Sequence, residues 1–155
     1  TADGPKVLEF NCRFGDPETQ AVLPRLRSDL VDLCTAAREP GGLAGVEAEF
    51  TPDWAVTLVL ASRGYPESSS KGDVIEGVEA AAATGAEITH AGTAVEDGKL
   101  VTAGGRVLNV TALGPDAATA RERAYDAAEL ITFGGRQIRT DIAARAVEKT
   151  EQEIR

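Results

Sequence analysis

Three polar or charged residues alternate with apolar ones near the start of the chain, in the stretch KVLEFNCRF at residues 6–14. Because successive side chains of a β-strand point to opposite faces, Glu9, Asn11 and Arg13 would share one face, about 7 Å apart. A carboxylate and an amide oxygen are ligands suited to Mg²⁺, which leaves coordination positions for phosphates. Arginine can grip phosphate or carboxylate oxygens in a bidentate fashion. The pattern predicts a metal and phosphate site on one face, with Cys12 and its apolar neighbours in a core on the other.

The same alternation has a simpler interpretation, because an antiparallel strand with one solvated face shows it without binding anything. The acidic turn that follows makes the stretch more informative. Asp16 is placed to cap a helix with Pro17 in its first position, and Glu18 suits the positive end of that helix. A polar strand face that ends at a helix N-terminus is a natural place for bound anions.

Composition limits the function classes. The chain has 155 residues, of which 43% are apolar and 26% charged, as in ordinary globular proteins. The net charge of −9 argues against a nucleic-acid surface, and no apolar run is long enough to cross a bilayer. One histidine and two cysteines cannot supply a tetrahedral zinc site. Two cysteines without a disulfide framework predict a reducing, cytoplasmic location.

The start of the chain raises a question of its own. The first residue is Thr1, and the sequence contains no methionine. Removal of an initiator methionine before Thr1 is one explanation. The explanation we favour is that residues 6–14 are an internal strand of a longer protein, of which this chain is a C-terminal portion.

Periodicity and turn signals predict the remaining elements. The expected helices cover residues 17–25 and 29–38 (capped by Ser28), 115–131, and about ten residues from Asp141. The expected strands cover residues 6–14, 54–61, 87–93, 99–102 and 106–113. Residues 74–84 are ambiguous, and the dipeptides Asp97-Gly98 and Gly104-Gly105 are hairpin signals. The sum is an α+β fold with an antiparallel sheet covered by helices.

Residues 13–20 (RFGDPETQ) resemble the signature octapeptide of the phosphoribosylamine–glycine ligase family, the glycinamide ribonucleotide synthetases, within the ATP-grasp superfamily. The flanks, LEFN before it and PRL and SDL after it, agree with the family. Further matching segments follow in the family's order: ASRGYP (61–66), KG (71–72), HAGT (90–93), GRVL (105–108), TALG (111–114) and RTDI (139–142). The resemblance covers essentially the whole chain.

The resemblance implies a division of the fold. Residues 1–50 would be the C-terminal end of an ATP-grasp domain, contributing its last strand and helices. Residues 51–155 would be a small C-terminal ligase domain with an antiparallel sheet and packed helices. The elements that hold adenine and cover the phosphates would come from the remaining N-terminal part of the same enzyme, so we expect the 155-residue chain alone to be inactive and to bind MgATP weakly or not at all.

The resemblance also implies a reaction of de novo purine biosynthesis. Glycine would attack the γ-phosphate of ATP, and the amine of 5-phosphoribosylamine would displace phosphate from the glycyl phosphate. Glycinamide ribonucleotide, ADP and phosphate would result. Glu9 and Asn11 match the family's Mg²⁺-binding Glu-x-Asn, for Mg²⁺ or Mn²⁺. Arg13 would stabilise the transferred phosphoryl group or the glycyl phosphate. Asp16 and Glu18 could bind a substrate amine or ribose hydroxyls, although helix capping also accounts for both.

Two alternatives stay open. Other ATP-grasp carboxylate–amine ligases or carboxylases share a Glu-x-Asn-x-Arg strand but not the Gly-Asp-Pro-Glu-Thr-Gln that follows it here. A non-catalytic module could retain the fold for binding. The chain also departs from the family, which often has an aromatic residue before Lys71-Gly72 where this sequence has three serines. We interpret His90 as structural, and Tyr65 and Lys71 as loop residues that could border a substrate cleft.

Overall fold

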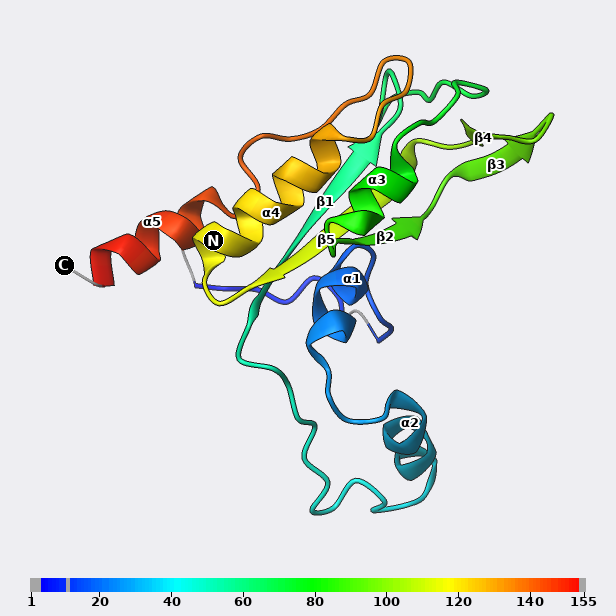
Figure 1. Cartoon of the computed structure of the whole chain (residues 1–155). Coiled ribbons are helices and arrows are strands. Elements are labelled where there is room, and N and C mark those ends of the chain that lie inside the picture. The colour runs from blue at the N-terminus through cyan, green and yellow to red at the C-terminus, as the bar shows by residue number, and fades with distance from the viewer. Residues whose placement is uncertain (1–3, 11, 154–155) are drawn as a thin grey trace.

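The structure is a computed structural model that describes residues 4–10 and 12–153. Its helices are α1 (Glu18–Val22), α2 (Leu30–Arg38), α3 (Val78–Ala83), α4 (Ala117–Glu129) and α5 (Ala144–Glu153), with a 3₁₀ turn at Leu23–Arg25. Its strands are β1 (Trp54–Ala61), β2 (Glu87–His90), β3 (Thr93–Glu96), β4 (Lys99–Thr102) and β5 (Arg106–Gly114), as Figure 1 shows. None of these helices is both long and apolar enough to cross a membrane. The predicted α+β fold with an antiparallel sheet is confirmed.

The sheet has the strand order β1-β5-β2, and both pairings are antiparallel. Strands β3 and β4 form a separate hairpin, whose turn at Asp97-Gly98 has positive φ at both residues (49° and 74°), as a two-residue I′ turn requires. The second predicted hairpin is wrong. Gly104-Gly105 carries the chain from β4 into β5, which pairs with β1 and β2 instead of β4. The predicted strand 87–93 is also broken, because β2 ends at His90 and β3 begins at Thr93.

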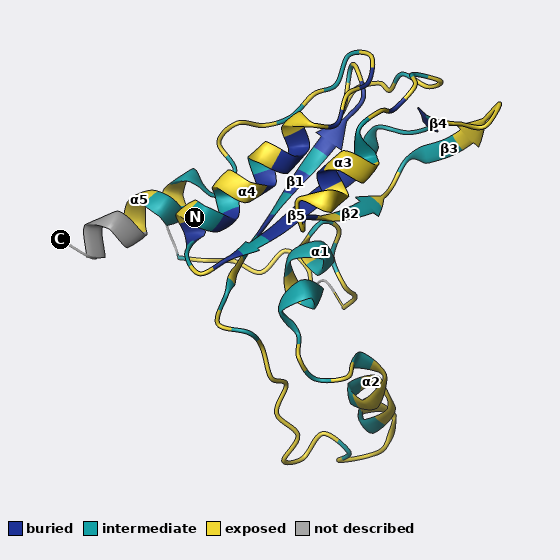
Figure 2. Ribbon diagram, viewed as in Figure 1, coloured by how far each residue is buried: buried dark blue, intermediate teal, exposed yellow. Residues whose placement is uncertain are grey.

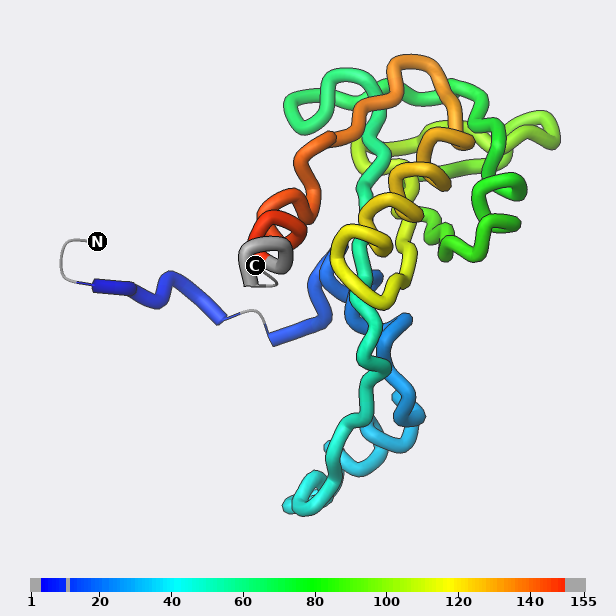
Figure 3. The backbone as a smooth tube through the Cα atoms, turned by 60° about the vertical axis from the view of Figure 1, so that its left-hand side comes forward, coloured from blue at the N-terminus to red at the C-terminus, as the bar shows by residue number. Residues whose placement is uncertain are grey.

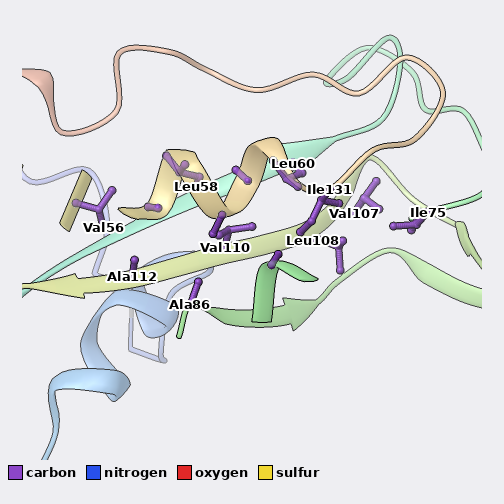
Figure 4. Packing of buried hydrophobic residues seen from close by; sticks show 14 of the residues in the cluster. Val56, Leu58, Leu60, Ile75, Ala86, Val107, Leu108, Val110, Ala112 and Ile131 are labelled. Atoms are coloured by element: carbon purple, nitrogen blue, oxygen red, sulfur yellow. The ribbon is translucent and has the colours of Figure 1, made fainter. Parts of the chain in front are cut away.

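The core lies on one face of this sheet. Val56, Leu58 and Leu60 alternate along β1, and their cross-strand partners on β5 are Ala112, Val110 and Leu108. Helix α4 packs across both strands with a stripe of fully buried alanines, and α3 lies beside it over β2 (Figures 1 and 4). Small side chains let the helix approach the sheet closely, so the larger strand residues fill the space between them.

Two helices begin at an aspartate cap. The Asp116 carboxylate accepts a hydrogen bond from the Thr119 backbone N–H at 2.7 Å, at the start of α4. Asp29 does the same for Val31 and Asp32 at the start of α2, so the prediction that Ser28 caps this helix is wrong. The Ser28 hydroxyl instead accepts a bond from the Glu49 N–H at 2.8 Å.

The opening stretch differs most from expectation. The described residues 4–10 and 12–14 form no strand, and in Figure 3 the segment runs outward from the folded body. Leu8 is 97% and Phe10 80% exposed, and Cys12 is exposed too, so their predicted place in a core is wrong for this structure. The physical reason is that a strand needs a neighbour to bond its backbone, and no described segment pairs with this one.

A second projection, which we call the arm (residues 28–48), carries α2 away from the body (Figures 1 and 3). None of the residues of α2 is buried, and Figure 2 shows the contrast with the buried residues of β1, β5 and α4. The arm is tied at its base, where the Arg27 N–H donates to the Glu49 carbonyl and the Thr51 N–H to the Arg25 carbonyl, each at 2.8 Å.

The contact between α3 and the end of α4 makes a testable prediction. Gly77 precedes α3 with φ 85°, and a Cβ there would lie 1.8 Å from the Leu130 carbonyl oxygen. We expect Gly77→Ala to lower the free energy of unfolding by about 3 kcal/mol, because left-handed strain and a backbone clash add. Gly98→Ala is the matched control, since Gly98 also has positive φ (74°) but open space around it. It should cost about 1 kcal/mol in urea denaturation, and equal losses would contradict the close approach.

The α4 cap predicts a pH dependence. The pKa of Asp116 lies below its ordinary 3.8, chiefly because the carboxylate accepts hydrogen bonds from the Thr119 backbone N–H and hydroxyl. A depressed folded-state pKa gives stability that is present above the unfolded pKa and is lost as the pH falls through the folded value. Compared with Asp116→Asn, which keeps a cap without titrating, the native protein should be more stable at pH 7, and this advantage should diminish as the pH falls below 3.8 and vanish once it has passed the lowered folded-state pKa. Thermal unfolding across this range measures it, and a Tm difference independent of pH would contradict the assignment.

Candidate functional site

The octapeptide lies where the opening segment meets the folded body. It ends in α1, which packs against β1 and β5. Asp16 does not cap this helix as predicted, since Pro17 is the residue before α1 and no side chain caps it. The Asp16 carboxylate instead accepts a hydrogen bond from Gln20 Nε2 at 3.0 Å and lies 3.8 Å from Arg106 Nη2. It is therefore held by a neighbour in α1 and by a distant residue of β5.

The other predicted site residues lie in the opening segment and at the start of α1. Glu9 is exposed in the unpaired opening segment, and Asn11 lies outside the described residues. Arg13 is exposed, and its Nη1 donates to the Phe14 carbonyl at 2.8 Å. Glu18 is exposed in the first turn of α1. Within the described part of the chain, no group of three or more His, Cys, Asp or Glu side chains could hold a metal ion.

A cavity of about 590 Å³ adjoins the octapeptide. Pro17, Thr57, Val59, Tyr65 and Arg106 are among the residues that line it. Thr57 and Val59 alternate along β1 with the core residues, so this part of the lining lies on the sheet face opposite α4. Leu58, Ile138 and Ile142 also line the cavity and belong to the core side of β1. Its volume is within the range of pockets that bind small molecules, and its lining joins apolar walls to a few polar groups.

The sheet face that carries the cavity is unusually polar. Thr57 Oγ1 lies 2.9 Å from Thr111 Oγ1, and Asn109 Nδ2 donates to Thr89 Oγ1 at 3.2 Å. Asn109 is 1% exposed, and its Oδ1, like Oε1 of Gln20, is buried without a hydrogen-bond partner among the described residues. Both oxygens belong to the side of the sheet against which α1 packs.

A second wall of the cavity comes from the segment after α4. Gln137 exchanges backbone hydrogen bonds of 2.8 Å with Ala61 at the edge of β1. The Tyr125 hydroxyl of α4 donates to the Arg139 carbonyl at 2.7 Å and accepts from the Ile142 N–H at 3.2 Å. These contacts fix Ile138, Arg139 and Ile142, which also line the cavity. Helix α4 therefore sets the position of this wall.

Arg139, in this wall, forms a bidentate pair with Asp141. Its Nε donates to Oδ1 at 2.9 Å, and its Nη2 donates to Oδ2 at 2.6 Å. The hydrogen bonds from Arg139 hold the pKa of Asp141 below its ordinary value, and the same pairing raises the pKa of Arg139. Both groups are therefore charged at neutral pH. The guanidinium of Arg139 is therefore paired with a carboxylate in its own segment, whereas that of Arg106 donates a hydrogen bond to Asp16 of the octapeptide.

The loop after β1 forms the remaining wall. The ring of Tyr65 lies against Gly105, where a Cβ would come within 2.6 Å of the ring. The Ser62 hydroxyl, fully buried, donates to the Gly104 carbonyl at 2.9 Å. Tyr65 thus borders the cavity as the sequence suggested, whereas Lys71 does not line it. His90 is exposed, with Nδ1 3.0 Å from Thr93 Oγ1, which fits the structural role predicted for it.

The family described as "Phosphoribosylglycinamide synthetase, C domain" matches residues 55–145, more than half of the chain. The chain belongs to this family. The matched C domain contains β1 apart from Trp54, β5, α4 and every cavity residue named above except Pro17.

Similar proteins extend the match beyond the C domain. The phosphoribosylamine–glycine ligase of Neisseria meningitidis is 52% identical over 94% of this chain, and that of Pseudomonas putida is 49% identical over 98%, which includes the octapeptide. A trifunctional purine biosynthetic protein of Gallus gallus is 48% identical over 95% of the chain. The chain spans about a third of the length of the bacterial relatives (34% and 35%) and 15% of the Gallus protein.

The fold agrees with a solved structure as well. The crystal structure of phosphoribosylamine–glycine ligase from Thermotoga maritima has a TM-score of 0.67 and 38% identity, covering 89% of this chain and 33% of that one. The family interpretation drawn from the octapeptide and its accompanying segments is confirmed.

Sequence reasoning missed two residues of the site, Arg106 and Gln20. Both lie in segments that carried the resemblance, GRVL and the end of the octapeptide, but neither received a role. The Arg106 guanidinium donates to the Asp16 carbonyl oxygen at 2.8 Å across 90 residues of chain. No local pattern signals a contact over such a separation.

The cavity wall gives a prediction of its own. Ser62→Ala removes the hydroxyl that bonds the Gly104 carbonyl, beneath the loop on which Tyr65 lies. We expect the free energy of unfolding to fall by about 1 kcal/mol, the usual net value of a buried hydrogen bond. Ser69→Ala, at an exposed position in the same loop, is the control and should change it by less than about 0.5 kcal/mol. Equal effects in chemical denaturation would show that the Ser62 bond does not hold this wall.

Proposed function

We propose that the chain is the C-terminal part of an ATP-dependent ligase that joins glycine to 5-phosphoribosylamine. The reaction runs through a glycyl phosphate and yields glycinamide ribonucleotide, ADP and phosphate, in de novo purine biosynthesis. The observation that carries this proposal is the meeting of the octapeptide and the family's C domain at one cavity, through Asp16 and Arg106. Relatives named phosphoribosylamine–glycine ligase, about half identical over nearly the whole chain, support it.

The proposal includes the division of the chain. Residues 1–50 are the C-terminal end of an ATP-grasp domain, and residues 51–155 are the C-terminal ligase domain. The opening segment exposes Leu8, Phe10 and Phe14, and an apolar row of this kind is suited to packing against the remaining N-terminal part of the enzyme. That part supplies the adenine site and the groups over the phosphates, so the isolated chain is inactive. The cytoplasmic location stays a prediction.

Glu9 and Asn11 are proposed to hold Mg²⁺ or Mn²⁺ together with ATP. The donor chemistry fits a hard cation, since the exposed Glu9 carboxylate forms no ion pair with the described residues. Two protein oxygens leave the other positions to phosphates and water, which is how Mg²⁺ usually binds. A metal bound there neutralises charge on the phosphates of ATP.

The proposed roles of the remaining site residues follow from their charges. The Arg13 guanidinium is exposed in the opening segment and stabilises the negative charge of the transferred phosphoryl group or of the glycyl phosphate. Asp16 and Glu18 are exposed carboxylates at the start of α1 and bind a substrate amine or ribose hydroxyls. Asp16 is the better defined of the two, because Gln20 and Arg106 fix it on separate sides.

ADP release from MgATP tests the function directly. The assay contains phosphoribosylamine, with glycine supplied or withheld, and compares the full-length gene product with the 155-residue chain. We expect glycine-dependent turnover by the longer protein only. Arg13→Ala in the full-length protein should lower kcat by about 100-fold, the usual effect of losing a group that stabilises developing charge. Arg38→Ala, an exposed arginine at the end of α2, is the control and should leave kcat unchanged. ADP release without glycine dependence would refute the substrate assignment.

A further inference from the structure

An irregularity in the sheet decides where Arg106 points. Leu60 of β1 pairs with Leu108 of β5, but the next residue, Ala61, pairs with Arg106 and not with Val107. One extra residue of β5 is therefore accommodated at this point, which is a β-bulge. In a regular strand Arg106 would lie on the same face as Leu108, the face covered by α4. The bulge shifts the alternation, and Arg106 lines the cavity on the opposite face with Thr57 and Val59.

The redirected side chain reaches the octapeptide at two atoms. Arg106 Nη1 donates to the Asp16 carbonyl at 2.8 Å, and Nη2 lies 3.8 Å from Asp16 Oδ2. Gln20 Nε2 donates to the other carboxylate oxygen, Oδ1, at 3.0 Å. The backbone and both carboxylate oxygens of Asp16 are thus engaged, from β5 on one side and from α1 on the other. The hydrogen bond fixes where the guanidinium lies, and the ion pair at 3.8 Å adds charge attraction to the carboxylate.

The ion pair between Arg106 and Asp16 adds little to stability. The side chains of Arg106 and Asp16 are 38% and 48% exposed, and ion pairs at that exposure are screened by water and contribute little to folding. Sheet bulges commonly serve to re-aim a side chain beside a functional site. The bulge places the arginine within reach of Asp16, a proposed substrate-binding carboxylate.

We propose that Arg106 is a positioning residue for Asp16, through which the sheet of the C domain aligns the octapeptide for substrate binding. This rests on the proposed function, in which Asp16 contacts a substrate amine or ribose hydroxyls. Arg106 acts through Asp16 and not on the phosphates of ATP. The C domain therefore contributes to substrate affinity through a contact 90 residues away in sequence.

The experiment measures kcat and the KM values for glycine, phosphoribosylamine and ATP in the full-length enzyme that contains this chain. The variants are Asp16→Asn, Arg106→Gln, Arg106→Lys and the double variant Asp16→Asn/Arg106→Gln. Asp16→Asn identifies the substrate that the carboxylate serves. We expect Arg106→Gln to raise the KM of that same substrate about tenfold, the loss of one charge-assisted contact, with the KM for ATP unchanged. Arg106→Lys should recover part of the loss, because it keeps the charge without the fork.

The double variant separates positioning from an independent effect. If Arg106 acts through Asp16, the double variant is no worse than Asp16→Asn alone. Arg123→Gln is the matched control, because Arg123 also donates to a backbone carbonyl, that of Leu113 at 2.9 Å, but does not contact the octapeptide. Its kinetics should be unchanged, and Tm values for all variants report folding.

Three results would overturn the proposal. Arg106→Gln could leave every KM unchanged, raise the KM for ATP equally, or multiply the loss caused by Asp16→Asn. A lower Tm with an unchanged KM would assign Arg106 a structural role only. The wild-type enzyme decides the larger question. Without glycine-dependent ADP release the proposed function fails and the positioning role with it, whereas turnover with an unaffected Arg106→Gln variant refutes the positioning role alone.

Discussion

The pairing of β1 with β5 is the interaction on which the rest of the structure depends. It runs in one antiparallel register from Trp54 opposite Gly114 to Leu60 opposite Leu108. That register places Val56, Leu58 and Leu60 of β1 on the α4 face, where close packing with small helix residues excludes water. It also gives the opposite face its row of threonines and asparagine, against which α1 lies. A shift of one residue would exchange the two faces, so the pairing fixes the core and the cavity together.

Much of this could be predicted from sequence because the signals are local. The apolar run of β1, the Asp97-Gly98 turn and helix α4 each follow from residues close together in the chain. The predictions failed where the structure of a segment depends on a partner that is distant in the sequence. Gly104-Gly105 resembles a hairpin turn, but β5 finds better partners in β1 and β2. The opening segment alternates like a strand, yet alternation does not supply a neighbouring strand, and the described chain offers none.

The candidate site shows the same division between local and remote information. Asp16 and Glu18 could be selected from the octapeptide because acidic residues around a helix start are a recognisable pattern. Arg106 could not, because its orientation depends on an irregular step between two strands and its partner lies 90 residues earlier. That Arg106 lines the cavity can be recognised only in the assembled sheet. The family comparison and the geometry then agree on which domain carries it.

The arm has a consequence for how this fold can vary. Its two ends meet at a short antiparallel contact, where Leu26 lies opposite Phe50. The arm is therefore a loop that is closed at its base. The entropy of closing a flexible loop grows with the logarithm of its length, by about 0.6 kcal/mol for each doubling. Because α2 buries no residue, its packing within the described part of the chain does not tie the length of the arm to the sheet. Chains with this architecture are therefore free to lengthen, shorten or replace the segment between Arg27 and Glu49 while the sheet, α4 and the cavity keep their geometry.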